Sequence, residues 1–138
     1  MIETRFYTDA DYEAVKRNLE EGNLFDPTID TRETLWAKLV DNPQSILVAS
    51  VDGNVVGSVY ILQDRWSSFI FRLAVQTNYR KLGVGRRLVE EAESILRRKG
   101  IRDVALWVRE DNQELQEYYK RLGYTPTAVY YRCMHKEL

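Results

Sequence analysis

The pattern of apolar and polar residues changes period along the chain. It begins with an alternation over residues 2–7, which predicts a short strand. Two helical stripes follow. The first comes after the capping pair Thr8-Asp9 and ends at Gly22, and the second has Asp30 at its capping position and ends before Pro43. The first third of the chain therefore predicts a strand and two short helices.

A period of two residues then returns over three consecutive segments. Residues 45–51 and 55–62 flank Asp52-Gly53-Asn54, a sequence typical of a tight hairpin turn. Residues 68–75 read as a third strand. The middle of the chain therefore predicts an antiparallel meander.

The longest helical stripe follows this meander. It begins near residues 83–85 and runs to Lys99. A strand is predicted over residues 103–108, and strand, helix and strand in this order indicate a right-handed parallel crossover. A last helix opens at residues 111–114, which have capping-box spacing, and a last strand is predicted over residues 127–134.

Composition and charge narrow the class of protein. The 138 residues fit one domain, spanning residues 1–138, and a net charge of −1 argues against a nucleic-acid binder or a polybasic membrane-surface protein. No apolar run approaches the roughly 20 residues of a membrane span, and the start does not follow the plan of a signal peptide. We therefore expect a cytoplasmic protein with no membrane or nucleic-acid partner. The single cysteine and single histidine, Cys133 and His135, predict neither an internal disulfide nor a metal site.

The most specific feature is the pattern Arg80-x-x-Gly83-x-Gly85 between a predicted strand and the long helix. A helix N-terminus exposes unpaired backbone N–H groups and favours anions, and glycines let phosphates approach the backbone. Lys81, Arg86 and Arg87 add further positive charge without an acid between them. The pattern predicts a pyrophosphate cradle, and its alternative is a solvated basic turn.

Two other phosphate-binding motifs fit less well. A P-loop requires a lysine and a hydroxyl residue that Gly83-Val84-Gly85 lacks, and Leu88 occupies the position of the third glycine of a dinucleotide fingerprint. A nucleotide-binding protein remains an alternative, and it would bind NAD or ATP.

Three further segments accompany the glycine pattern: Leu73-Ala74-Val75 directly before it, the segment 112–124 with Asn112 and Tyr118-Tyr119, and the ending 131–136. Together with the order of the predicted elements, they resemble the Gcn5-related N-acetyltransferase (GNAT) superfamily over nearly the whole chain. The resemblance implies an α/β (α+β) fold. The central sheet would be mixed, mostly antiparallel and of six to seven strands, with helices on both faces and one parallel βαβ crossover.

The resemblance also implies roles for individual residues. Acetyl-CoA would be the co-substrate, with no metal, and the backbone of Leu73, Ala74 and Val75 would pair with its pantetheine arm. The N–H of Val75 would polarise the thioester carbonyl, Asn112 would contact the arm, and Tyr119 would stand near the sulfur. The pyrophosphate would be held by the backbone of Lys81, Leu82, Gly83, Val84, Gly85 and Arg86, with side-chain charge from Arg80 and Arg86.

The implied reaction is transfer of an acetyl group to a primary amine of a small molecule or a peptide, by direct attack on the thioester. Many family members carry a glutamate base on the fourth strand, but residues 69–72 of this chain contain no acid. Asp64 or Glu110 could act through water, and the base stays unassigned. A non-catalytic CoA-binding sensor or interaction module on the same fold is the alternative.

The acceptor side is expected around the first two helices, the loop 23–29, the turn near residues 64–67 and the last hairpin. Candidate lining residues are Phe25, Asp26, Trp36, Trp66 and Tyr130. Asp26 could hold a cationic amine. The alternating last strand would also permit two copies to pair as a homodimer.

Overall fold

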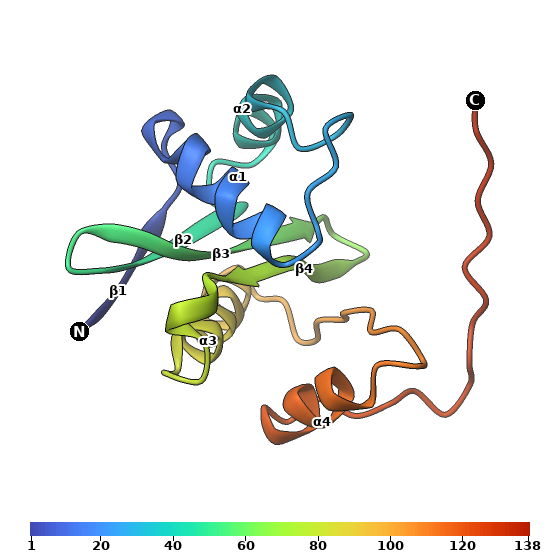
Figure 1. Cartoon of the computed structure of the whole chain (residues 1–138). Coiled ribbons are helices and arrows are strands. Elements are labelled where there is room, and N and C mark those ends of the chain that lie inside the picture. The colour runs from blue at the N-terminus through green and yellow to red at the C-terminus, as the bar shows by residue number, and fades with distance from the viewer. The chain divides into compact units, whose positions relative to one another are not determined.

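The computed structural model describes all residues 1–138, which divide into two compact units, Met1–Trp107 and Val108–Leu138. The first unit holds every strand and all helices but α4 (Figure 1). The elements, with η denoting a short 3-10 helix, are β1 (Ile2–Phe6), η1 (Asp9–Asp11), α1 (Tyr12–Glu21), α2 (Arg32–Asp41), β2 (Ile46–Val51), β3 (Asn54–Gln63), β4 (Ser68–Val75), η2 (Thr77–Tyr79), α3 (Val84–Arg98) and α4 (Gln113–Arg121).

The four strands form one antiparallel sheet in the order β1-β2-β3-β4. Asp52 and Gly53 join β2 to β3 with φ angles of 50° and 79°, the combination that a tight two-residue hairpin with the twist of its strands requires. The predicted antiparallel meander is confirmed.

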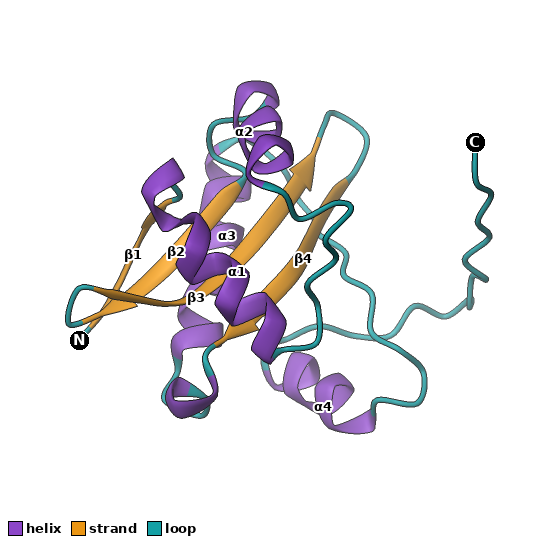
Figure 2. Ribbon diagram, turned by 45° about the horizontal axis from the view of Figure 1, so that its top comes forward, coloured by secondary structure: helices purple, strands orange, loops and turns teal.

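Helices cover both faces of the sheet, with α1 and α3 on opposite sides (Figure 2). The apolar face of α3 is buried and consists of Val84, Leu88, Val89, Ala92, Ile95 and Leu96. On the α1 and α2 face the core consists of Tyr7, Val15, Leu19, Leu35, Ile46, Val48, Val55, Tyr60 and Ala74. Because both faces are covered, buried residues run almost continuously along β2 and β3 instead of alternating.

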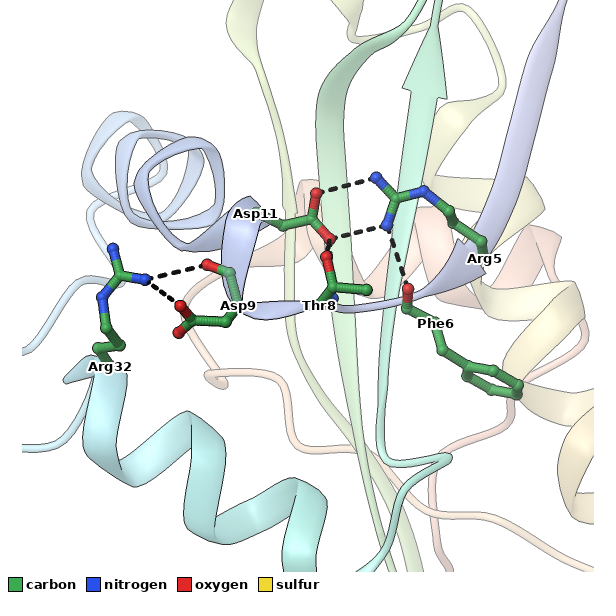
Figure 3. A network of polar contacts seen from close by, with 6 residues as sticks. All are labelled: Arg5, Phe6, Thr8, Asp9, Asp11 and Arg32. Carbon is green, nitrogen blue, oxygen red and sulfur yellow. Dashed lines mark hydrogen bonds and ion pairs between the residues drawn. The ribbon is translucent and has the colours of Figure 1, made fainter.

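A polar network fixes the start of the chain against α1 and α2 (Figure 3). The guanidinium of Arg5 donates to both carboxylate oxygens of Asp11, at 2.7 and 2.8 Å, and the backbone N–H of Thr8 donates to the same carboxylate at 2.8 Å. Burial alone would raise the pKa of Asp11, but these hydrogen bonds outweigh it and lower that pKa below its usual value. Arg32 at the start of α2 pairs with Asp9 at 2.7 Å.

Two predicted helix caps move by one residue. The N-cap of α2 is Thr31, whose side chain accepts a hydrogen bond from the N–H of Thr34, and not Asp30. The N-cap of α4 is Asn112, whose Oδ1 accepts from the N–H of Leu115 at 3.0 Å. In each case two adjacent residues, Asp30-Thr31 or Asp111-Asn112, have side chains that suit an N-cap. The backbone conformation of the folded chain determines which of the two accepts a hydrogen bond from the helix.

The sheet of this structure has four strands, fewer than the six to seven that were expected. The predicted strand 103–108 is reduced to one parallel bridge, in which Ala105 pairs with Phe69. The predicted strand 127–134 has no regular structure and its side chains are exposed. A period of two residues gives a segment a strand-like pattern, but a strand forms only where its backbone finds a partner.

None of the helices combines the length and the apolar character that crossing a membrane requires. No group of three or more His, Cys, Asp or Glu side chains is arranged to hold a metal ion.

Candidate active site

The outer edge of β4 is open beyond its first residues. There the N–H of Ile70 and the carbonyl of Ser68 bond to Ala105, at 3.0 and 2.9 Å. From residue 71 to residue 75, the sheet gives β4 a partner strand only on the β3 side. An open strand edge presents a row of N–H and C=O groups to which an extended ligand can add.

β4 bulges just before the predicted cofactor-binding residues. Tyr60 faces Phe71 and Ser58 faces Ala74, so Arg72 and Leu73 together oppose a single residue of β3. Arg72 has a φ of 54°, a left-handed conformation that costs a residue with a Cβ roughly 1 kcal/mol. Such a bulge bends the strand and redirects the groups that follow it.

The backbone of Val75 points toward the open edge. The N–H of Gln76 donates to the carbonyl of Val56 on β3 at 2.7 Å. Because successive amides alternate in direction along a strand, the N–H and C=O of Val75 face away from β3. Arg80 occupies the carbonyl side, where its Nε donates to Val75 O at 3.0 Å. The N–H of Val75 therefore faces the open edge, and its role as the donor to an oxyanion stays a prediction.

The turn after β4 leads directly into the N-terminus of α3. Lys81 and Gly83 have φ angles of 63° and 89°, and Gly83 is the N-cap. The first backbone bond of the helix runs from the N–H of Arg87 to Gly83 O at 3.0 Å. The N–H groups of Val84 and Gly85 come before that bond, in the first turn, where backbone N–H groups find no acceptor within a helix. Such a terminus favours anions, and binding of a pyrophosphate here stays a prediction.

Two basic side chains of the proposed cradle, Arg80 and Arg86, have hydrogen-bond partners within the protein. Arg80 donates to Val75 O, and the Nε of Arg86 lies 2.8 Å from Glu90 Oε1, one helical turn further on. Lys81 and Arg87 are exposed. Glu90 lies just beyond the stretch in which the sequence shows no acid, so the local positive charge is smaller than the sequence indicates. That Arg80 and Arg86 contact a pyrophosphate stays a prediction.

The sequence did not predict that the carboxylate of Glu21 binds the segment between β4 and α3. Glu21, at the end of α1, accepts from the N–H and the hydroxyl of Thr77, at 2.9 and 3.2 Å. These bonds, the backbone one foremost, lower the pKa of Glu21. No local pattern links two residues so far apart in sequence.

Asn112 and Tyr119 lie in the second unit, Val108–Leu138. Tyr119 is 8% exposed, and its ring makes edge contacts with Tyr118 and Tyr124 at centroid distances of 5.2 and 5.7 Å. Burial, aided by Tyr118, raises the pKa of Tyr119 to about 12, so its hydroxyl keeps its proton at neutral pH. The Oδ1 of Asn112 caps α4. Their roles toward the cofactor stay predictions.

Neither candidate base gains support from its surroundings. Asp64 accepts from the N–H groups of Trp66 and Ser67, at 2.7 and 2.9 Å, which lowers its pKa and makes it a weaker base. Glu110 is exposed, in the second unit. The base therefore stays unassigned.

The five candidate acceptor residues differ in their surroundings. Phe25 packs on the core under the ammonium of Lys16, 5.4 Å from the ring centroid. Asp26 accepts from the N–H and hydroxyl of Thr28, at 2.8 and 2.6 Å. The remaining three are largely exposed: Trp36, Trp66 and Tyr130. A contact between any of them and an amine stays a prediction.

A half-buried lysine on α2 lies against β4. The Nζ of Lys38 donates to Ile61 O at 2.6 Å and lies 5.1 Å from the centroid of the Phe71 ring. Burial lowers its pKa to about 8, although Asp41 opposes the shift. The ordinary pKa of lysine is about 10.4, so between about pH 8 and pH 10 the unfolded chain binds more protons than the folded one.

We therefore expect Lys38→Met to remove a pH dependence. Stability of the unsubstituted protein should rise with pH through this window, and the variant should lack that rise. At pH 7 the variant should be more stable by about 2 kcal/mol, after allowing for the partial exposure of the amine. Urea unfolding at intervals from pH 7 to 9.5 measures both, and parallel curves for the two proteins would contradict the expectation.

Comparisons with known proteins show the family of this chain. The model of the acetyltransferase (GNAT) family matches residues 10–124. An acetyltransferase of Pectobacterium atrosepticum is 32% identical over 123 residues, which cover 89% of this chain and 87% of that protein. An acetyltransferase of Sodalis glossinidius is also 32% identical, with the same coverage.

Solved structures show the same fold. Ard1 from Thermoplasma volcanium superposes with a TM-score of 0.81 at 29% identity, covering 92% of this chain and 84% of that one. The PaiA N-acetyltransferase from Thermoplasma acidophilum, solved in complex with coenzyme A, gives a TM-score of 0.79 at 22% identity, covering 94% and 92%. The expected fold class is confirmed. With its family match and its acetyltransferase relatives, this chain belongs to the acetyltransferase (GNAT) family.

Proposed function

We propose that the chain transfers an acetyl group from acetyl-CoA to a primary amine of a small molecule or peptide. The observation that carries the proposal is that the open β4 edge at Leu73–Val75 is followed, after η2 and the turn at Lys81 and Gly83, by the N-terminus of α3. An extended arm ending in a pyrophosphate matches that sequence of binding groups, strand edge first and helix terminus second. The PaiA relative solved with coenzyme A supports the same ligand.

The reaction forms a C–N bond and breaks a C–S bond. The amine nitrogen attacks the thioester carbonyl carbon, and negative charge develops on the carbonyl oxygen. The N–H of Val75 is the proposed donor to that oxygen; loss of one such donor costs about 3 kcal/mol in other enzymes. The electrons of the broken bond leave on sulfur, and the proton of the attacking amine passes to water.

Tyr119 is the proposed donor to the leaving sulfur. Its pKa of about 12 keeps the phenol protonated at neutral pH, so it can donate a hydrogen bond to a thiolate. The reference pKa of a thiol is about 8.5, so complete proton transfer from the phenol is uphill. The role proposed for Tyr119 is therefore hydrogen bonding, with the proton supplied by solvent. Asn112 is proposed to contact the pantetheine arm.

The first test is calorimetric titration with acetyl-CoA, with NAD and ATP as controls. Selective binding of acetyl-CoA is expected, and equal binding of NAD would contradict the proposed cradle. Turnover is then followed as thiol release with spermidine and with an alanine-initiated hexapeptide as amines.

Tyr119→Phe should lower kcat by about 100-fold with little change in acetyl-CoA affinity, because only the hydrogen bond to the leaving sulfur is lost. Tyr118→Phe, one position away on the same helix, is the matched control and should keep kcat within about 3-fold. Equal losses in both variants would count against the role of Tyr119.

A non-catalytic CoA-binding module is the second candidate. It is favoured by the absence of an acid from residues 69–72 and by the use of the Asp64 carboxylate in its own turn. Selective binding of acetyl-CoA without thiol release in the presence of amines would support this reading over catalysis.

A further inference from the structure

The side chain of Arg72 links the β4 bulge to the loop between α1 and α2. One guanidinium nitrogen donates to Leu24 O at 2.9 Å. Another lies 3.2 Å from Asp30 Oδ2. Leu24 and Asp30 stand near the two ends of the loop 23–30, so one planar group holds both ends.

Asp30 is the buried end of this link. Its side chain is 3% exposed, and its Oδ2 also accepts from the N–H of Asp26 at 2.8 Å. The hydroxyl of Tyr12 donates to the backbone oxygen of Asp30 at 2.8 Å. A buried carboxylate needs a cation and hydrogen bonds, and Arg72 is the cation within ion-pair distance.

The backbone of Arg72 adds an independent argument. Its φ of 54° is a conformation that glycine or asparagine adopts more easily. A strained residue is held where the surrounding structure fixes it, and strain of this kind clusters at functional sites. Here the strained residue directly precedes Leu73, the first proposed cofactor-binding residue, and its side chain holds the loop expected on the acceptor side.

We infer that Arg72 is a positioning residue that fixes the acceptor-side loop 23–30 against the cofactor strand, so that binding of the amine, and not of acetyl-CoA, depends on it. The inference rests on the proposed function. Arginine suits this role because its rigid fork reaches a carbonyl and a carboxylate together, whereas the single ammonium of lysine is a point charge.

The test uses three variants of the full chain. The double variant Arg72→Met with Asp30→Asn removes the link without leaving a buried carboxylate unpaired. Arg72→Lys keeps the charge but not the fork. Arg32→Lys is the control for loss of an arginine fork near the same loop, because Arg32 pairs with Asp9 and Glu13 and stacks on the Tyr12 ring, residues that lie outside β4. Amide hydrogen exchange of residues 23–30, the affinity for acetyl-CoA and the KM for the amine are measured on each.

In the double variant, exchange in residues 23–30 should quicken about 10-fold and the KM for spermidine or the alanine-initiated hexapeptide should rise about 10-fold. The Kd for acetyl-CoA should stay within about 2-fold, as should kcat. Arg72→Lys should give a smaller effect in the same direction, and Arg32→Lys none on KM. A merely structural role would lower the melting temperature and leave KM unchanged.

Unchanged exchange in the double variant would overturn the inference, and so would a Kd for acetyl-CoA that rises in step with the KM. If neither amine turns over, the Kd for spermidine, measured by calorimetry on the acetyl-CoA complex, takes the place of KM, and an unchanged Kd in the double variant would also overturn the inference. Failure of the unsubstituted protein to bind acetyl-CoA would instead contradict the proposed function, and the two failures are thus distinguishable.

Discussion

Replacing Gly83 by valine should weaken acetyl-CoA binding about 100-fold, which corresponds to about 2.7 kcal/mol. Gly83 has a φ of 89°, a conformation that a β-branched residue strongly disfavours. Relaxing that strain would rotate the peptide that leads into Val84 and turn the proposed phosphate-binding N–H groups away. Nothing of the protein lies within 4 Å of a Cβ built at Gly83, so the expected effect comes from backbone strain and not from a clash with the protein.

Gly100 provides a matched control at the other end of α3. It has a φ of 79°, and a Cβ built there also meets nothing within 4 Å. Both valine variants should lose roughly 1–2 kcal/mol of stability from backbone strain. Only Gly83→Val should lose binding in calorimetric titration. Equal losses of affinity in the two variants would show that the cradle lies elsewhere.

Replacing Gly57 by valine should lower the free energy of unfolding by about 3 kcal/mol. A Cβ at this position would lie 3.0 Å from Val84 Cγ1, 3.1 Å from Leu88 Cδ1 and 3.1 Å from Ala74 O. These neighbours belong to α3 and β4, and all three are buried. Packing of this density leaves little room for adjustment, so α3 must shift away from the sheet.

Gly57→Val should also weaken the binding of acetyl-CoA, because Val84 is the first residue of α3 and a shift of this helix moves the proposed phosphate-binding N–H groups. Urea unfolding and calorimetric titration of one preparation measure both effects. Gly57→Ala should lose less stability than Gly57→Val. Gly22→Ala should change stability by about 0.5 kcal/mol or less, since a Cβ at Gly22 meets only ordinary contacts of 3.5 Å or longer. A stable Gly57→Val variant would contradict the packing described for α3.

Local signals were sufficient for much of the fold. The Asp52-Gly53 turn and the strands on either side of it appear as predicted, and so does the long α3 with its flanking glycines. The reason is that a tight turn, a helix terminus and an amphipathic stripe are each set by residues close together in sequence. The glycine pattern before α3 likewise placed the start of that helix at Gly83, because a helix terminus is a local backbone property.

Other features depend on which segments find one another. A period of two residues marked 103–108 and 127–134 as strands, but the first forms one bridge and the second none, because pairing needs a partner backbone. The neighbouring Asp30 and Thr31 both suit a helix cap, and only the folded chain gives the cap to Thr31 and turns Asp30 toward Arg72.

The sequence by itself therefore determined the order of most elements, the family resemblance and the position of the proposed cradle. Only the tertiary structure decided the β4 bulge, the bond of Glu21 to Thr77 and the ion pair of Asp30 with Arg72. Each of these joins residues that are distant in sequence or depends on the register of two strands. Such contacts follow from the packing of both sheet faces, which no local pattern of residue types encodes.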